Sequence, residues 1–165
     1  MRSQIEIRPA CRADHSQIWA ILKPIFRAGE TYAIEPTISE DAALAYWAAP
    51  QNHVFVASEG GDSILGTYYV KPNGRGFADH ICNCGYAVAV NAQGKGVARA
   101  MLEQSLAQAK DLGFLAMQFN FVLESNARAI TTWERAGFET IGRIPKAYRH
   151  PSAGLVDARI MHKDL

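Results

Sequence analysis

The stretch that most constrains the fold is residues 87–104, AVAVNAQGKGVARAMLEQ. It joins an apolar run that starts at His80, HICNCGYAVAV, to a segment whose apolar residues repeat at helical spacing, with Gly94 and Gly96 at the junction. A run that is apolar nearly throughout is typical of a central strand covered on both faces. The stripe after it predicts a helix from about Gly96 to Leu112. The protein is therefore expected to contain a strand that passes into a helix through a glycine-rich turn.

The remainder of the sequence adds strand and helix signals in an order that fits a sheet with flanking helices. Alternating or continuous apolar residues predict further strands at 4–8, 53–58, 63–71, 115–122, 139–144 and 155–162. Apolar residues at helical spacing predict further helices from about 14 to 25, 39 to 49 and 127 to 136. This order predicts an α+β (α/β-like) fold.

Size, charge and cysteine content narrow the class of protein. A length of 165 residues favours a single domain over 1–165. The net charge of +1 argues against a general nucleic-acid-binding or membrane-surface protein, which would carry a basic excess. The sequence shows no signal peptide, no membrane-spanning run and no second Cys/His pair at zinc-ligand spacing. We therefore expect a cytoplasmic protein without a metal site, in which Cys82 and Cys84 are small buried side chains.

The glycine turn predicts an anion site. The first N–H groups of a helix lack partners within the helix and carry the positive end of its dipole. Without side chains at Gly94 and Gly96 an anion can approach the backbone closely, and polar groups surround the opening at Gln93, Lys95 and Arg99. These features favour phosphate binding; the alternative is a helix start that needs only a tight turn.

Two common nucleotide-binding motifs do not fit this turn. A Walker A loop requires a glycine five residues before Gly94 and a serine or threonine after Lys95, where this sequence has Ala89 and Gly96. The dinucleotide fingerprint requires a small residue where this sequence has Arg99, and a place in the first strand–helix unit of a parallel sheet. A nucleotide-binding protein is therefore the weaker interpretation.

Two stretches at the proper distance from each other resemble the signatures of a known superfamily. Residues 93–98, QGKGVA, fit the pattern Q/R-x-x-G-x-G/A, and residues 126–138, NARAITTWERAGF, are similar to N-x-x-A-(x)n-[YF]-E-[KR]-x-G-F. Both patterns belong to the GNAT superfamily of acyl-CoA-dependent N-acetyltransferases, which the order of elements also resembles over nearly the whole sequence. The resemblance implies a mixed sheet of six to seven strands, about four helices and a splay between the fourth and fifth strands. It also implies acetyl-CoA as co-substrate and direct attack by an amine in a ternary complex.

The resemblance assigns residues to the cofactor. In the family the pantetheine arm pairs with the fourth strand, which implies contacts from Tyr86, Ala87 and Val88. The pyrophosphate would be bound by Gln93, Gly94, Lys95, Gly96, Val97, Ala98 and Arg99. Asn126 matches an asparagine that contacts the cofactor arm in relatives, and it is also a candidate N-cap. The backbone N–H of Val88 is the candidate donor to the oxyanion.

Proton transfer is where this sequence departs from the family. Many relatives have a tyrosine on the last helix that acts as the general acid for the leaving sulfur. This sequence has Trp133 at that position, and an indole N–H cannot usefully give up its proton. With a thiol pKa of about 8.5, the thiolate is about 2–3 kcal/mol less stable than the thiol at neutral pH. The thiolate can therefore leave unprotonated if hydrogen bonds stabilise it. Candidate donors are Asn126, Asn120 and Trp133, with Tyr86 and Tyr148 as alternatives. His80 is a candidate general base, and a relay of waters is the alternative.

The resemblance also implies where the acceptor binds, because in the family the connector between the first two helices and the ends of the fourth and fifth strands usually shape the acceptor site. The candidate residues are Glu30, Thr31, Tyr32, His80 and Asn120. Asn120 lies in an apolar strand and needs a polar partner, which a substrate would supply. These stretches are similar to a subgroup that contains the yeast proline-analogue N-acetyltransferase and, more distantly, to phosphinothricin-type acetyltransferases.

That similarity implies a small amine or amino acid as acceptor, no nucleic-acid or membrane partner, and a possible homodimer, since dimers are common in the family. Two alternatives stay open. One is a non-catalytic acyl-CoA-binding or sensing domain. The other is an acetyltransferase that acts on a protein N-terminus or a lysine.

Overall fold

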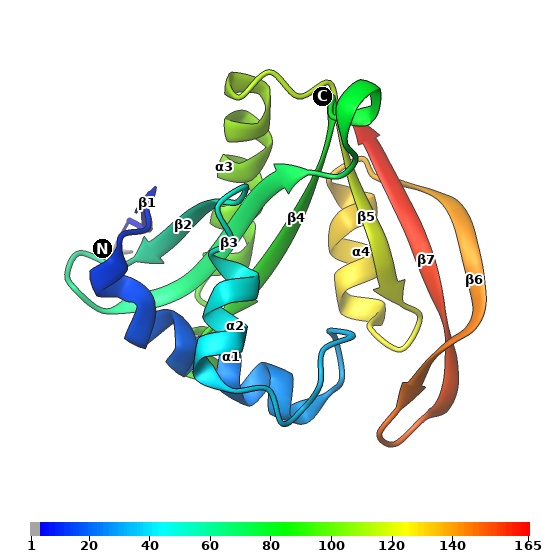
Figure 1. Cartoon of the computed structure of the whole chain (residues 1–165), viewed down its shortest axis with the longest axis horizontal. Coiled ribbons are helices and arrows are strands. Elements are labelled where there is room, and N and C mark those ends of the chain that lie inside the picture. The colour runs from blue at the N-terminus through cyan, green and yellow to red at the C-terminus, as the bar shows by residue number, and fades with distance from the viewer. Residues whose placement is uncertain (1–3) are drawn as a thin grey trace.

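The computed structural model describes residues 4–165 as a seven-stranded sheet with two helices on each face (Figure 1). The strands are β1 (Glu6–Pro9), β2 (His53–Ser58), β3 (Ile64–Pro72), β4 (Ile81–Val88), β5 (Ala116–Leu123), β6 (Glu139–His150) and β7 (Gly154–Asp164). The helices are α1 (His15–Ala28), α2 (Glu40–Trp47), α3 (Val97–Asp111) and α4 (Ala127–Arg135).

The strands follow the order β1-β2-β3-β4-β5-β7-β6 across the sheet. All neighbours are antiparallel except β4 and β5, which are parallel. The polypeptide passes from β4 to β5 through α3, because a parallel pair needs a crossover connection. The mixed sheet confirms the expected α+β fold.

Each face of the sheet is covered by one pair of helices. Leu22 of α1 and Trp47 of α2 are fully buried against the first face. Met101 of α3 and Ile130 of α4 pack against the opposite face, with Tyr68 of β3. The two cores therefore hold the central strands between layers, as the apolar character of β4 predicts.

β4 and β5 are paired only where they begin. Ile81 lies opposite Ala116 and Cys82 opposite Met117. The amide of Asn83 then bridges to the backbone of β5 at 2.9 Å. Beyond this point the two strands diverge (Figure 1). The expected splay is confirmed, and we refer to this opening as the gap.

The ends of β4 and β6 differ from the sequence prediction. β4 ends at Val88 rather than at residue 90, because a short 3₁₀ turn at Val90–Ala92 follows it. β6 continues to His150 rather than ending at residue 144, because it passes through a bulge and then pairs with β7 again. Pro145 and Lys146 lie in that bulge and interrupt the alternation by which strands are predicted.

The cysteines behave as the sequence predicts. Cys82 and Cys84 are buried free thiols in the core beneath α3, and Cys11 is an exposed free thiol. Burial raises the pKa of Cys84 well above its ordinary value. Its thiol therefore stays neutral at physiological pH and serves as a packing group.

Asp14 is a buried carboxylate that ties β1 to the start of α1. It accepts hydrogen bonds from the Arg8 guanidinium at 2.7 and 2.8 Å and from the backbone N–H of Cys11 at 2.8 Å. The Arg8 hydrogen bond holds the pKa of Asp14 well below its ordinary value, despite the opposing effect of burial. A carboxylate with a lowered pKa stabilises the fold above its unfolded-state pKa, and this stabilisation is lost as the pH falls through the lower folded-state value.

We expect Asp14→Asn to lower the free energy of unfolding by about 1–2 kcal/mol at neutral pH and by progressively less between about pH 4 and pH 2. Chemical denaturation of both proteins across this range measures the difference. A difference that stays constant down to pH 2 would contradict this role of Asp14.

Gly66 of β3 lets α3 lie close to the sheet. A Cβ at this position would be 2.8 Å from Val97 Cγ1 and 2.9 Å from Met101 Sδ, closer than real contacts allow. We expect Gly66→Ala to lower the free energy of unfolding by about 1–3 kcal/mol, because the start of α3 must shift. Gly61→Ala is the control, since a Cβ there has nothing within 4 Å. Thermal melts that show equal losses for the two variants would rule out this close packing.

Candidate functional site

The glycine turn between β4 and α3 adopts a backbone that only glycine accepts readily. Gly94 and Gly96 have φ values of 78° and 83°, in the left-handed region. Gly96 is the N-cap residue of α3 and has no side chain with which to cap the helix. Val97 is 1% exposed and anchors the start of the helix in the core, while Gln93 and Lys95 are exposed beside the turn.

The turn presents a row of backbone donors. The first intrahelical hydrogen bond of α3 runs from the N–H of Ala100 to the carbonyl of Gly96, at 3.0 Å. The N–H groups of residues 96–99 precede it and have no acceptor within residues 4–165. Ala98 is exposed beside them, and the Arg99 guanidinium forms an exposed ion pair with Glu103 at 2.8 Å. The turn can therefore bind an oxyanion through four consecutive N–H groups.

The edge of β4 that faces the gap offers further backbone groups. The N–H of Ala89 donates to the carbonyl of Leu65 on β3 at 2.8 Å, so the alternation along β4 turns the N–H of Val88 toward the gap. The carbonyl of Tyr86 also faces the gap, because it accepts a hydrogen bond from Tyr32 Oη at 2.8 Å. Burial raises the pKa of Tyr32, so its hydroxyl remains a donor at neutral pH.

The side chain of Tyr86 points away from this edge. Its hydroxyl lies 2.6 Å from Ser105 Oγ on α3, and burial raises its pKa well above the ordinary value. The neighbouring Ala87 is buried in the core on the α1 and α2 face. Tyr86 and Ala87 can therefore reach a ligand in the gap through backbone groups, and the hydroxyl of Tyr86 is already engaged.

Trp133 of α4 occupies the position at which the sequence comparison expects a general-acid tyrosine. Its half-buried ring has its centroid 4.6 Å from that of Phe119 on β5 and 5.3 Å from that of Tyr86 on β4. The indole thus contacts both strands beside the gap. It forms an aromatic wall on the α3 and α4 face.

Two asparagines that the sequence singles out have partners within the protein. Asn126 caps α4, because its Oδ1 accepts a hydrogen bond from the N–H of Ala129 at 3.3 Å. The Nδ2 of Asn120 donates to Asn73 Oδ1 at 2.6 Å, and its Oδ1 accepts from Gln118 at 3.0 Å. Two neighbouring amides therefore supply partners for Asn120 in the protein without ligand, and its contact with a substrate stays a prediction. Asn120 is exposed.

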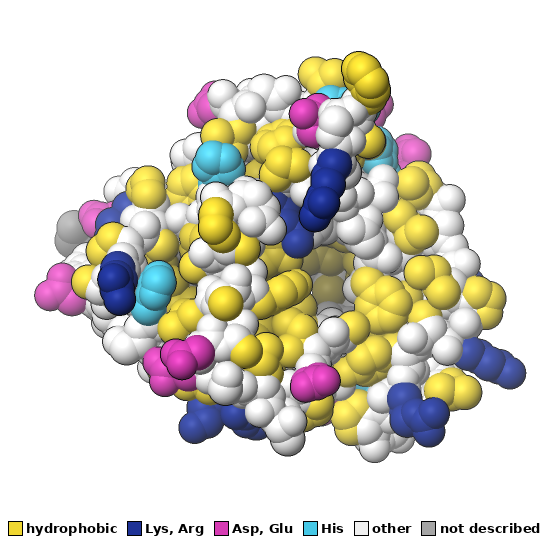
Figure 2. All heavy atoms as spheres, viewed as in Figure 1, with side chains coloured by type: hydrophobic (Ala, Val, Ile, Leu, Met, Phe, Trp, Pro, Cys, Tyr) yellow, Lys and Arg dark blue, Asp and Glu magenta, His cyan; other side chains and the backbone are white. Residues whose placement is uncertain are grey.

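The face of the sheet opposite α3 and α4 carries a polar group beside the gap. Ala87 of β4 is buried in the core on this face. Asn83 points to the same face, because it is four residues before Ala87 and alternate residues of a strand share a face. Lys71 lies opposite Asn83 in the register of β3 with β4, and its Nζ lies 5.3 Å from the centre of the Tyr69 ring. Asn120 shares this face, because the preceding Phe119 points to the other core. Figure 2 shows the surface hollowed near the centre of this face, with hydrophobic side chains around it and charged side chains of both signs at its rim.

The connector between α1 and α2 contains three of the candidate acceptor-site residues, and one of them, Tyr32, reaches the gap. Tyr32 is half-buried, with its ring edge-on to Phe26 and Trp47 at centroid distances of 5.6 and 6.0 Å. Glu30 and Thr31 precede it and are exposed.

His80 lies at the opposite end of β4 from the gap. It is exposed, and its backbone carbonyl accepts a hydrogen bond from Leu115 at 2.9 Å, where β4 and β5 are paired. Tyr86 is six residues further along the strand, which corresponds to about 20 Å. The structure therefore does not bring His80 together with the other candidate residues.

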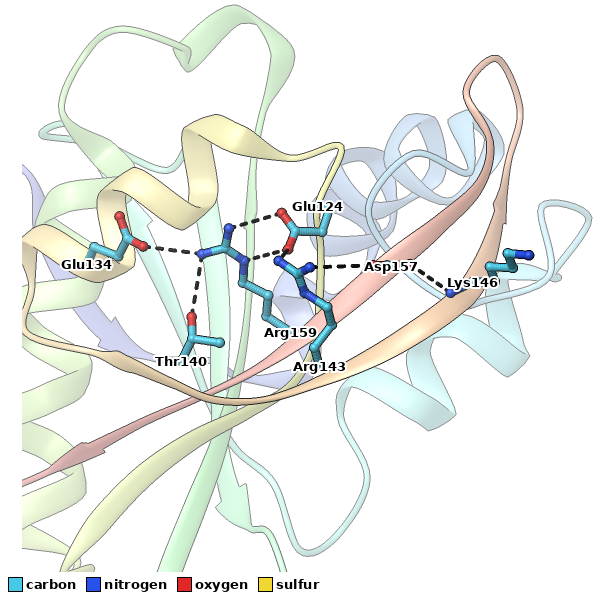
Figure 3. Close-up of polar contacts among 7 residues, drawn as sticks. All are labelled: Glu124, Glu134, Thr140, Arg143, Lys146, Asp157 and Arg159. Carbon is cyan, nitrogen blue, oxygen red and sulfur yellow. Dashed lines mark hydrogen bonds and ion pairs between the residues drawn. The ribbon is translucent and has the colours of Figure 1, made fainter.

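The sequence suggests Tyr148 only as an alternative donor to the leaving thiolate, and it does not indicate the contacts that the β6–β7 hairpin makes. Tyr148 of β6 donates a hydrogen bond to the backbone carbonyl of Gly29, in the connector, at 2.6 Å. At the other side of the hairpin, Arg159 binds both carboxylate oxygens of Glu124 at 2.8 and 3.0 Å, and Arg143 binds the same carboxylate at 2.9 Å (Figure 3). Arg159 thereby lowers the pKa of Glu124. No local pattern signals such contacts, because the partners lie on separate elements.

The chemical groups at the turn and the gap are backbone amides, carboxamides and aromatic rings, together with the cationic side chains of Lys71, Lys95 and Arg99. Residues 4–165 contain no group of three or more His, Cys, Asp or Glu residues that could hold a metal ion. Within that same described range, no helix combines the length and apolar character needed to cross a membrane.

Comparison with known proteins gives a consistent result. Residues 16–138 match the family described as "Acetyltransferase (GNAT) family". The sequence is 39% identical to N-acetyltransferase aca1 of Schizosaccharomyces pombe over 99 residues, which are 59% of this protein and 47% of that one. The matched region thus spans about half the length of this curated relative.

Solved structures extend the similarity to the whole protein. A GCN5-related N-acetyltransferase from Kribbella flavida is 35% identical, with a TM-score of 0.92 over 98% of both proteins. A phosphinothricin acetyltransferase from Sinorhizobium meliloti, solved in complex with acetyl-CoA, is 22% identical, with a TM-score of 0.85 over 100% of this protein and 89% of that one. At 22% identity, the similarity to the Sinorhizobium meliloti structure shows a shared fold only.

Proposed function

Because the chain belongs to the acetyltransferase (GNAT) family, we propose that it transfers the acetyl group of acetyl-CoA to the amine of a small molecule, such as an amino acid or an analogue. The observation that carries the proposal is the row of four N–H groups at residues 96–99, which have no acceptor among residues 4–165 and lie next to the edge of β4 that faces the gap. These donors suit the diphosphate of coenzyme A, and the gap suits its extended arm. The side chains of Gln93 and Lys95 would add contacts at the mouth of the turn.

The backbone of β4 would orient the reacting group. Acetyl-CoA supplies an acyl thioester whose carbonyl carbon accepts the amine nitrogen. The N–H of Val88 faces the gap and would donate to the negative charge that develops on the carbonyl oxygen. A fixed backbone donor needs no reorganisation during the reaction, which makes it more effective than a mobile side chain.

The leaving thiolate would depart without a tyrosine acid. Trp133 stands at the relevant position of α4, and the hydroxyls of Tyr86 and Tyr148 are held by Ser105 and Gly29. A thiolate is only about 2–3 kcal/mol less stable than the thiol at neutral pH, so hydrogen bonds from the protein and protonation by water suffice. Asn126 lies at the start of α4 and is the candidate donor from this side.

The polar groups beside the gap, on the α1 and α2 face of the sheet, support a zwitterionic acceptor. Lys71 would provide the positive charge for a carboxylate, and Asn83 lies on the same face. Asn120 would contact the acceptor by exchanging its hydrogen bonds with Asn73 and Gln118 for bonds to the ligand. The carboxylate of Glu30 would attract the ammonium at the connector, and Tyr32 would line the approach to β4. With no titratable side chain assigned to remove the proton, water would carry it to solvent.

An assay of thiol release tests the proposal. Purified protein is incubated with acetyl-CoA and a panel of amino acids, polyamines and peptides, with each N-acetylated amino acid as its matched blocked control. We expect release with at least one free amino acid and none with its blocked form. Tight CoA binding without turnover on any amine would instead support a binding or sensing domain. Turnover only on peptides would indicate a protein acetyltransferase.

A further inference from the structure

We propose that Tyr148 of β6 is a positioning residue for the acceptor: it holds the connector between α1 and α2 against β4 and so sets the affinity for the amine without taking part in CoA binding. This inference rests on the proposed acetyltransferase function. It starts from the contact of the connector with the gap. Tyr32 Oη reaches the carbonyl of Tyr86, so any displacement of the connector changes the wall of the gap directly.

Tyr148 fixes the connector from the opposite side. Its hydroxyl donates to the carbonyl of Gly29 at 2.6 Å and lies 3.3 Å from the carbonyl oxygen of Tyr32. Gly29 ends α1 with a φ of 63°, so the backbone turns at the residue that Tyr148 holds. The ring of Tyr148 also lies edge-on to Phe121 of β5 at a centroid distance of 6.2 Å. The connector is therefore held between two tyrosine hydroxyls, one of its own and one from the hairpin.

The direction of Tyr148 depends on the bulge that precedes it. The register of β6 with β7 shifts between Ile144 and Tyr148, and Lys146 adopts a φ of 50°, which non-glycine residues rarely do. The backbone N–H of Lys146 donates to Asp157 Oδ1 of β7 at 2.8 Å. The Asp157 carboxylate thus stabilises the turn of the backbone that aims Tyr148 at the connector.

The bulge is in turn tied to the segment that leads into α4. Arg143 binds Glu124 at 2.9 Å and lies 3.9 Å from the carboxylate of Asp157 (Figure 3). Arg159 of β7 binds the same Glu124 and extends to Glu134 of α4 at 3.3 Å. These ion pairs anchor both strands of the hairpin at its base, so that Tyr148 extends from a fixed support.

The test compares single substitutions at two positions of the hairpin in the full-length protein. Tyr148→Phe removes only the hydroxyl, and we expect it to raise the KM for the amine about three- to tenfold, the effect of one hydrogen bond, with the Kd for CoA unchanged. Asp157→Ala should act in the same direction, and Asp157→Asn should restore the wild-type KM because its amide oxygen can still accept from Lys146. Tyr68→Phe is the matched control, since its buried hydroxyl has no partner among residues 4–165.

Hydrogen exchange gives a second readout that does not depend on turnover. The hydrogen-bonded amides of residues 25–28, in the last turn of α1 before the connector, should exchange faster in Tyr148→Phe than in wild type or Tyr68→Phe, while those of α3 stay unchanged. An unchanged amine KM together with unchanged exchange in the last turn of α1 would overturn the inference. A wild-type protein that binds CoA but acetylates no amine would refute the proposed function instead, and the exchange comparison would still decide whether Tyr148 holds the connector.

Discussion

The Gly96→Leu variant is expected to bind CoA at least about 100-fold more weakly than wild type while keeping its fold. The backbone at Gly96 has a φ of 83°, and its N–H belongs to the row of donors that would meet the diphosphate. A leucine side chain there would project from the same exposed turn and deny an anion close approach. A Cβ at Gly96 has nothing within 4 Å, so the protein itself has room for it. Isothermal titration of both proteins with CoA measures the loss.

Gly113→Leu is the control that separates the loss of CoA binding in Gly96→Leu from the effect of backbone strain. Gly113 follows the other end of α3, has a φ of 88°, and a Cβ there also has nothing within 4 Å. Both variants should therefore lose about 1–2 kcal/mol of stability, because a side chain in the left-handed region is strained. Only Gly96→Leu should lose CoA affinity. Equal affinities for the two variants would show that the turn does not bind the cofactor.

Trp47→Ala is expected to lower the free energy of unfolding by about 3–5 kcal/mol, the largest effect on stability that we predict. Trp47 is 0% exposed, and its Nε1 donates to Thr67 Oγ1 at 3.1 Å in the core. Its ring also packs edge-on against Tyr69 and Tyr32, at centroid distances of 4.9 and 6.0 Å. The cavity would therefore loosen the tyrosine that contacts the gap, and urea denaturation measures the loss of stability.

Trp47→Ala should affect the binding of the amine and the binding of CoA to different extents. The core around Trp47 lies on the α1 and α2 face, whereas the glycine turn is anchored through Val97 in the opposite core. We therefore expect the KM for the amine to rise more than the Kd for CoA. Trp19→Ala is the control, because Trp19 is only partly buried at the same core and should cost about 1–2 kcal/mol. A Trp47→Ala variant no less stable than Trp19→Ala would contradict the packing described here.

Local patterns in the sequence predict the elements that surround the proposed cofactor site. The apolar run of β4 and the glycines after it have consequences that depend on neighbouring residues only: a buried strand, a turn with positive φ and a helix start. Ser39 and Asn126 likewise cap α2 and α4 through hydrogen bonds to nearby N–H groups. Each of these features is determined within a few residues, and the sequence is therefore sufficient to find it.

The proposed acceptor site depends on contacts between distant residues, which no local pattern in the sequence indicates. Tyr148 is 119 positions from the carbonyl that it binds, and Arg159 is 35 positions from Glu124. The bulge at Lys146 breaks the strand pattern, which is why the sequence predicts a shorter β6. Asn120 shows the same limit, since its partner Asn73 comes from the loop after β3. A polar residue in an apolar strand indicates that a partner exists but not where it comes from.

The most direct test of the cofactor site is a titration of isotope-labelled protein with CoA, followed through its amide resonances. We predict that the N–H groups of residues 94–99 shift most at the lowest CoA concentrations, together with that of Val88 on the edge of β4. Saturation with CoA that leaves these resonances in place, with the largest shifts elsewhere in the protein, would contradict a cofactor site at the glycine turn.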